Sequence, residues 1–303
     1  MNARSLSLKK KSNDRTGKIT KIESIESGKN EKRNFQMASP DISITSLLLC
    51  FLLLIIPLAI SYRIKLRISR ATIDAVSRMT VQLVMAGVFL TYVFDLNNGA
   101  LNMAWVLGMV VIASYTTIKN VELKMEKLLL PVVLSFMAAN ISVLLYFNEF
   151  VLDLGNLLEA RYLIPVGGMI LGNSLRGNIV GMGEFYEDIR RNENRYLYNL
   201  SLGASRYEAL TPYIRKCLRS ALKPTLANIA TAGLVFLPGM MTGQILGGAS
   251  PMLAIKYQIS IMIALYVSTS MSTAFSIFST IHTTFDEYGL VKKEIYREKR
   301  KRK

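Results

Sequence analysis

The sequence predicts an all-α protein, a polytopic membrane helix bundle with about seven transmembrane helices. The chain is 51% hydrophobic yet carries a net charge of +16, so its apolar and charged residues must occupy different places. Residues 42–62 contain no charge over about the length that crosses a hydrocarbon core of roughly 30 Å. Lipid offers an exposed backbone no hydrogen-bond partner, and the strands of a barrel would be shorter and alternating in pattern. Apolar segments of this length are therefore expected to be helices.

Apolar stretches recur along the chain and define the predicted domains. The seven predicted spans are residues 42–62, 79–96, 101–118, 128–147, 162–182, 224–247 and 252–281, and Asp95, Arg176 and Lys256 are the charged residues inside them. The predicted domains are a basic, disordered amino-terminal extension over 1–40, a transmembrane domain over 41–285, and a basic cytoplasmic tail over 286–303.

Basic residues predict the orientation, because Lys and Arg accumulate in short cytoplasmic loops. By this rule segments 63–78, 119–127, 183–223 and the tail face the cytoplasm, whereas the acidic or uncharged segments 97–100, 148–161 and 248–251 face outward. Seven spans then place the amino terminus outside. That placement conflicts with the ten basic and four acidic residues among the first 40.

The cytoplasmic segment 183–223 carries helix stop and start signals. We expect a first helix to continue from the fifth span and to end before Gly203, since glycine commonly terminates helices. Ser205 and Glu208 fit a capping box and predict a short helix over about 206–210. Pro212 predicts a new start, because proline suits the first position of a helix. The predicted arrangement is a helix down, a short lateral helix and a helix up.

A short helix held away from the bilayer suits a groove on a soluble motor, to which it would couple the membrane helices. The alternative is a cytoplasmic hairpin that merely caps the bundle. The residues alone leave both interpretations open.

Motifs for catalysis are missing. Gly172 and Gly177 are spaced like the glycines of a phosphate-binding loop, but Asn178 and Ile179 stand where that loop needs Lys and Ser or Thr. His282 is the single histidine, which excludes sites built from clustered His and Cys ligands. We therefore expect no enzyme activity, no cofactor and no nucleic-acid partner, and any ATPase must be a partner chain.

The sixth span carries glycines at four-residue spacing. Gly239, Gly243 and Gly247 share one helical face, which allows another helix to approach closely. Pro238 removes a backbone hydrogen bond, so the helix can bend or break there. Such a face can simply pack a bundle, or it can allow a bent helix to swing during gating.

Polar residues inside the spans are candidates for a substrate pathway, since they usually face an interior cavity. Lys256 and Arg176 could instead extend toward the interface. Thioether sulfur suits some transition metals, although methionine in a span commonly serves packing. The candidates are Asn173, Arg176, Gln244, Lys256, Tyr257 and Gln258 for the pathway, with Met240 and Met241 as weak metal ligands.

Three stretches resemble a known family: "LPGMMTGQILGGASPMLAIKYQI", "GMILGNSLRG" and "LGASRYEAL". Over about residues 40–285 the chain is similar to the UPF0014 group of bacterial iron-export ABC transporter permeases, with plant aluminium-sensitivity membrane proteins as relatives. The resemblance implies a permease that forms a homodimer and couples to a separate cytosolic P-loop ATPase. It favours the coupling helix over the capping hairpin and implies a motor contact at Gly203, Ala204, Ser205 and Glu208.

The chain departs from the wider ABC permease pattern in one place. Leu197, Tyr198 and Asn199 stand where such permeases often carry Glu-Ala-Ala, so its motor contact is expected to differ in fit. The leading hypothesis is an ABC-type permease exporting a metal ion such as iron. The alternatives are a permease for a nucleotide sugar and a non-transporting membrane scaffold. We expect the lipid bilayer of the plasma membrane as the host, with an organelle membrane as the alternative.

Overall fold

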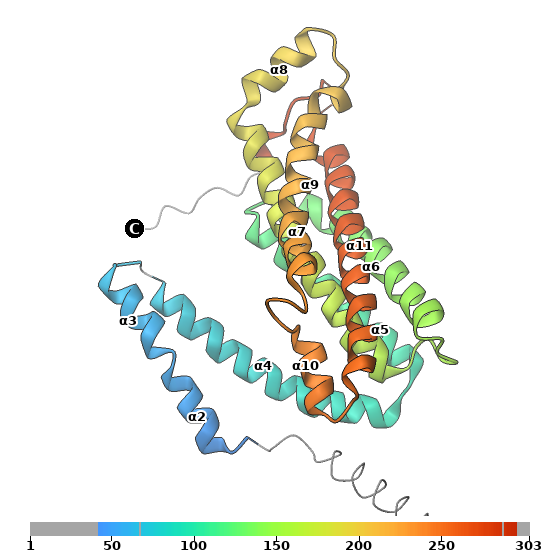
Figure 1. The fold of residues 1–303 in the computed structure, drawn as a ribbon. Helices are drawn as coiled ribbons and strands as arrows, with labels where there is room; N and C mark the ends of the chain where they lie inside the picture. Colours follow the sequence, from blue (N-terminus) through green and yellow to red (C-terminus); the bar gives the residue numbers. More distant parts are fainter. Residues whose placement is uncertain (1–41, 67, 287, 296–303) are drawn as a thin grey trace, which may run out of the picture. The chain divides into compact units, whose positions relative to one another are not determined.

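The computed structural model of this protein describes residues 42–66, 68–286 and 288–295 (Figure 1). Within these ranges the chain forms helices and no β-strand, apart from two isolated bridges, which confirms the all-α membrane bundle. The prediction for residues 1–40 lies outside the described residues, as do residue 287 and residues 296–303 of the predicted basic tail.

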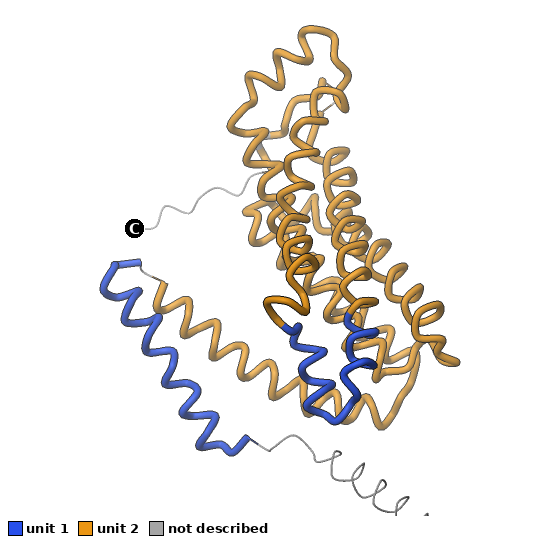
Figure 2. The backbone as a smooth tube through the Cα atoms, in the orientation of Figure 1, with its two compact units in different colours: residues 1–66, 237–258 blue, residues 67–236, 259–303 orange. Residues whose placement is uncertain are grey.

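The chain divides into two compact units (Figure 2). Unit 1 comprises residues 1–66 and 237–258, and unit 2 comprises residues 67–236 and 259–303. The helices of unit 1 are α2 (Ile44–Leu52), α3 (Ile55–Arg63), α10 (Gly239–Leu246) and the first turns of α11 (Pro251–Thr284).

Unit 2 holds the helical bundle. Its elements are α4 (Ser69–Leu96), α5 (Gly99–Asn120), α6 (Met125–Tyr146), the π-helical turn η1 (Phe147–Val151), α7 (Ala160–Arg191), α8 (Glu193–Ser201), α9 (Arg206–Thr231), the rest of α11, and the 3₁₀ turn η2 (Lys293–Ile295). The central helix is α7, which contacts α4, α5, α6, α8 and α9.

Five helical segments of the described chain are long and apolar enough to cross a membrane. They are residues 44–63, 69–96, 99–120, 125–151 and 251–284. The predicted count of seven is therefore not confirmed. The predicted span 162–182 lies within α7, which is 32 residues long but carries polar residues such as Asn173, Arg176 and Asn178 in its middle.

The predicted span 224–247 is not one helix. Helix α9 ends at Thr231 and α10 begins at Gly239, with Pro238 as its N-cap. Between them Gly233 adopts a left-handed conformation with φ +80°, and its N–H donates to Phe236 O at 3.0 Å. A proline also lacks the N–H that would continue a helix. The break anticipated at Pro238 is thus present, and it begins six residues earlier.

The helices in the segment 183–223, which is predicted to be cytoplasmic, also differ from those expected. The first helix does not run unbroken to Gly203, because α7 ends at Arg191 and a separate α8 follows Asn192, whose φ is −115°. The prediction of a short lateral helix over 206–210 is wrong, because α9 continues through Pro212. One proline removes a single backbone hydrogen bond from the helix, and the hydrogen-bonded turns on both sides of it keep α9 continuous. Figure 1 shows α8 inclined to α7 at the end of the bundle.

The two ends of unit 2 group the loops as the charge pattern predicts. At one end Asn102 Nδ2 donates to Leu158 O at 2.7 Å and Ala160 N to Asn97 Oδ1 at 3.1 Å, which joins the two loops assigned to the outside. At the other end Lys124 N donates to Ile295 O at 2.8 Å, which joins a loop predicted to be cytoplasmic to the segment after α11.

Two glycines of α7 allow α11 to approach closely. A Cβ atom on Gly177 would lie 2.4 Å from Thr269 Cγ2, and one on Gly181 would lie 2.6 Å from Thr273 Cγ2. Threonine is stiff at χ1 in a helix, so neither methyl group can move aside easily. The α7–α11 contact therefore requires glycine at both positions.

We expect Gly177→Ala to destabilise the protein by about 1–3 kcal/mol, because the added methyl overpacks the contact with Thr269. The thermal unfolding midpoint of the purified protein in detergent measures this. Adding Thr269→Ser removes the clashing Cγ2 and is expected to restore most of the loss.

Gly183→Ala is the matched control on the same helix, since a Cβ there meets no atom within 4 Å. Its midpoint is expected to equal or exceed the wild-type value, because alanine favours helix over glycine by about 1 kcal/mol. A Gly177→Ala variant as stable as Gly183→Ala would refute the packing argument.

Candidate functional site

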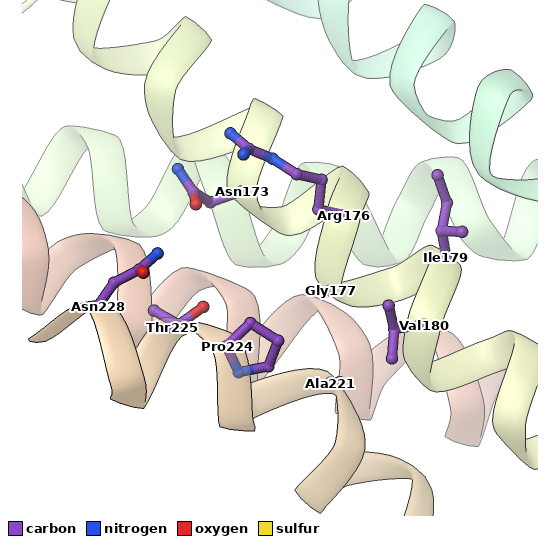
Figure 3. Close-up of a pocket in the computed structure, with 9 residues that line it drawn as sticks. All are labelled: Asn173, Arg176, Gly177, Ile179, Val180, Ala221, Pro224, Thr225 and Asn228. Atoms are coloured by element: carbon purple, nitrogen blue, oxygen red, sulfur yellow. The ribbon is translucent and has the colours of Figure 1, made fainter. Parts of the chain in front are cut away.

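A pocket of about 310 Å³ lies between α7 and α9 (Figure 3). Both helices supply polar groups to it, and the remaining lining is apolar. Its lining residues are Asn173, Arg176, Gly177, Ile179, Val180, Ala221, Pro224, Thr225 and Asn228. Two predicted pathway residues, Asn173 and Arg176, are thus brought to one cavity by their spacing on α7.

The polar groups of this pocket suit an anionic or polar solute. Arg176 is exposed, and its Nε donates to Gly172 O at 3.3 Å, which leaves the other guanidinium N–H groups able to donate. Asn173 Nδ2 donates to Met169 O at 3.0 Å. Figure 3 shows the amides of Asn173 and Asn228 on facing sides of the pocket. A guanidinium with neighbouring amides is a donor set that recognises phosphate or carboxylate oxygens.

The other four predicted pathway residues belong to unit 1, whereas the pocket belongs to unit 2. Gln244 lies on α10, and Lys256, Tyr257 and Gln258 lie in the first turns of α11. The Oε1 atoms of Gln244 and Gln258 are buried without a hydrogen-bond partner among the described residues. Their membership of one pathway with Asn173 and Arg176 stays a prediction.

The glycines at four-residue spacing in α10 face open space. A Cβ on Gly239 or Gly243 would meet no atom within 4 Å, and Gly247 is the C-cap of the helix. The close helix contact expected on this face stays a prediction, as does a metal role for Met240 and Met241. Among the residues that the structure describes, no three His, Cys, Asp or Glu gather as a metal site.

The turn between α8 and α9 is built as its residues predict. Gly203 has φ +90°, which a β-branched residue can hardly adopt, and its N–H donates to Leu200 O at 2.9 Å. Ser205 caps α9 in a capping box with Glu208. The Ser205 hydroxyl and N–H donate to the Glu208 carboxylate at 2.7 and 2.8 Å, and these bonds lower the pKa of Glu208.

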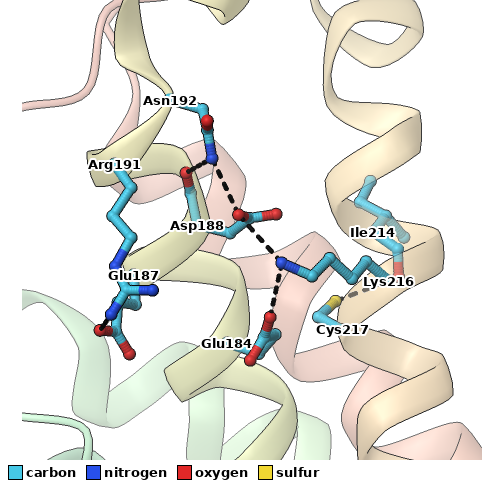
Figure 4. A network of polar contacts seen from close by, with 8 residues as sticks. All are labelled: Glu184, Glu187, Asp188, Arg191, Asn192, Ile214, Lys216 and Cys217. Atoms are coloured by element: carbon cyan, nitrogen blue, oxygen red, sulfur yellow. Dashed lines mark hydrogen bonds and ion pairs between the residues drawn. The ribbon is translucent and has the colours of Figure 1, made fainter.

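An ion-pair network fastens α9 to α7 below this turn (Figure 4). Lys216 Nζ lies 2.8 Å from Glu184 Oε1 and 3.1 Å from Asp188 Oδ1, and these two partners raise the pKa of Lys216. Asn192 Nδ2 donates to Asp188 Oδ1 at 2.9 Å, at the junction of α7 and α8. The network therefore links α7 and α9 at the start of α8, in the segment that the charge pattern predicts to be cytoplasmic.

The segment after α11 packs on the same region. Tyr196 OH of α8 donates to Gly289 O at 2.7 Å, and Arg206 Nη2 of α9 donates to Asp286 O at 2.6 Å. Tyr196 is buried, and this burial raises its pKa. Part of the predicted basic tail over 286–303 thus packs on the helices, since Asp286, Gly289 and Ile295 accept hydrogen bonds from them or from the loop before α6.

Sequence reasoning also missed the α9 side of the pocket. Pro224, Thr225 and Asn228 lie on one face of α9 at helical spacing. Asn228 lies inside a predicted span, and a polar residue in a span was the signal that could have found it.

A family model, "Uncharacterised protein family (UPF0014)", matches residues 44–285. This chain belongs to the UPF0014 family. It is 30% identical over 248 residues to the "Probable iron export permease protein FetB" of Escherichia coli, a match covering 80% of this chain and 93% of that protein. It is also 33% identical over 207 residues to "Protein ALUMINUM SENSITIVE 3" of Arabidopsis thaliana, covering 67% of this chain and 73% of that protein.

The rice "UPF0014 membrane protein STAR2" is 31% identical over 220 residues, which covers 72% of this chain and 75% of that protein. No solved structure matches the chain. Together with its five apolar spans, membership of UPF0014 makes the chain an integral, multi-pass membrane protein.

Cys217 should be unreactive in the folded protein. Its thiol is buried against α7, and burial raises its pKa to about 12, so on the order of one thiol in ten thousand is thiolate at pH 8. In a Cys50→Ser variant we expect no N-ethylmaleimide addition at pH 8 by mass spectrometry, and complete addition after denaturation. Labelling of the folded protein would show that the α7–α9 interface opens.

Proposed function

We propose that this chain is the membrane-spanning permease subunit of an ABC-type transporter, powered by a separate cytosolic ATPase. The observation that carries the proposal is the exposed α8–α9 turn, which is capped, braced and directly continuous with a pocket-lining helix. Family membership supports it, because the matched bacterial relative is named a permease and is covered over 93% of its length.

The geometry suggests how a motor could act on the pocket. Helix α9 begins at Arg206, directly after its N-cap Ser205 in the turn, and runs without a break to Asn228 in the pocket. A helix transmits displacement along its axis because each turn is hydrogen-bonded to the next. A partner that moves the turn would therefore shift Pro224, Thr225 and Asn228 relative to α7.

The cytoplasmic contacts determine what moves with the turn. Lys216 ties α9 to Glu184 and Asp188 of α7, and Arg206 ties it to the segment after α11. A displacement of Gly203 would therefore transmit force to α7, α9 and α11 together. In this proposal Gly203, Ala204, Ser205 and Glu208 form the motor contact, and two copies of the chain form the transporter.

Two substrate classes follow from different observations. The printed name of the bacterial relative points to iron, so a metal ion is the first candidate. The pocket favours the second candidate, a nucleotide sugar, because the Arg176 guanidinium attracts phosphate oxygens and repels a bare cation. Asn173, Asn228 and Thr225 would supply neutral hydrogen bonds to its polar groups.

Motor coupling is testable in the purified complex. We expect the protein to co-purify with a P-loop ATPase and to stimulate its turnover. Gly203→Val or Glu208→Ala is expected to reduce that stimulation at least fivefold. Valine cannot hold φ +90° without strain of about 1–3 kcal/mol, and alanine removes the capping box. Steady-state ATP hydrolysis measures the effect.

Gly155→Val is the matched control, since Gly155 lies in the loop at the opposite end and has open space around it. Normal turnover in both turn variants would contradict the assigned motor contact. A protein that brings down no ATPase would instead favour a scaffold.

The substrate class is testable through Arg176. For a nucleotide sugar, we expect the sugar to stimulate ATP hydrolysis in lipid nanodiscs, Arg176→Gln to remove the stimulation, and Arg176→Lys to keep part of it through the retained charge. For a metal ion, cells lacking the gene should accumulate iron, and Arg176→Gln should restore normal iron levels as well as the wild-type gene does.

A further inference from the structure

Helix α11 carries a buried row of hydroxyl groups through the bundle. The row runs from Ser268 to Thr284, which is 17 residues or about 24 Å of helix and thus most of a hydrocarbon core. All its members have an exposed fraction of 0%. They are Ser268, Thr269, Ser272, Thr273, Ser276, Thr280 and Thr284.

Side chains of α7 hydrogen-bond to this row, and one of them also bonds to α6. Asn178 Nδ2 donates to Ser272 Oγ at 2.9 Å. Ser174 Oγ donates to Asn140 Oδ1 at 2.6 Å and lies 3.5 Å from Ser268 Oγ. We name the resulting set the polar seam: Asn140, Ser174, Asn178, Ser268, Ser272, Thr273 and Ser276.

Three oxygens of the polar seam have no partner among the described residues. They are Asn178 Oδ1, Thr273 Oγ1 and Ser276 Oγ, and all three residues are completely buried. An unsatisfied buried polar atom costs about 1–3 kcal/mol, whereas an apolar residue of the same shape would avoid that cost. Three such atoms along one interface require an occupant that forms hydrogen bonds.

Other hydroxyls of the row need no occupant. Thr269 Oγ1 donates to Leu265 O at 2.7 Å, and Thr280 Oγ1 donates to Ser276 O at 2.7 Å. These bonds close on the helix itself, as Ser and Thr commonly do in helices. Within the row, the hydroxyls unpartnered in the described part of the chain are therefore those of Thr273 and Ser276.

The polar seam lies directly behind the pocket. Thr273 Oγ1 would be 3.5 Å from a Cβ on Gly177, and Gly177 itself lines the pocket. Asn178 follows Gly177 in α7. At this level Gly177, which has no side chain, lines the pocket on one side and faces Thr269 and Thr273 of α11 on the other.

We propose that water binds inside the bundle at Asn178, Thr273 and Ser276, and that the solute path opens from the pocket along this hydrated α7–α11 interface. Water suits the three oxygens because it can donate to the amide oxygen and either donate to or accept from the hydroxyls. It is also neutral and avoids the cost of burying a charge. The path, unlike the water site, rests on the proposed permease function.

Cysteine accessibility tests the water site without any motor or solute. In the Cys50→Ser background, Ser276→Cys is nearly isosteric, and Ile277→Cys is its control, because Ile277 is equally buried but packs in the apolar core. The probe is a small, water-soluble methanethiosulfonate reagent applied to the protein in lipid vesicles. Since a thiol ionises where water reaches it, we expect labelling at least tenfold faster at 276 than at 277.

Equal, slow labelling at the two positions would overturn the water site. If Ser276→Cys does not fold, Thr273→Cys carries the same comparison one turn earlier. Adding Asn178→Leu, which removes the amide and fills its space with methyl groups, should slow labelling at 276 toward the rate at 277. An unchanged rate would show that Asn178 is not part of the site.

The solute path has its own test in the complex with the motor. We expect ATP turnover to raise the labelling rate at 276 at least threefold and to leave the rate at 277 unchanged. No rise in a complex that hydrolyses ATP would overturn the path while the water site stands. A chain that binds no ATPase would overturn the proposed function and would leave the labelling contrast at rest intact.

Discussion

The close approach of α7 to α11 is the contact on which the rest of the bundle depends. Lipid offers no partners to polar groups, so a helix as polar as α7 is stable inside the membrane only where neighbouring helices come within hydrogen-bond distance. Gly177 and Gly181 make that approach possible, because each leaves room for a threonine of α11. The hydrogen bond from Asn178 to Ser272 forms across the same contact.

Polar groups in this protein are therefore distributed by depth and by side of α7. Toward α11 they are buried and pair with hydroxyls, apart from a few oxygens that have no partner among the described residues. Toward α9 they line a pocket large enough for a small solute. Near the α8–α9 turn they form partly exposed ion pairs such as Lys216 with Glu184, which contribute modestly to stability and mainly hold α9 in position.

Glycine serves two different purposes in this chain, although its spacing is the same in both. In α7 the glycines four apart meet the side chains of another helix within unit 2. In α10 a Cβ on Gly239 or Gly243 would meet no atom within 4 Å among the described residues. Glycines four residues apart indicate a helix face without side chains. Whether another helix packs on that face depends on the tertiary structure.

The sequence alone determined the all-α membrane class and the grouping of loops at the two ends. It also determined the left-handed Gly203 and the capping box of Ser205 with Glu208. Each depends on residues close together in the chain or on total apolar length. Tertiary structure decided the break after Thr231, the passage of α9 through Pro212, and the placement of Arg176 and Asn228 in the lining of one pocket. These depend on which helices pack together, and packing energy over many contacts outweighs the preference of a single proline or glycine.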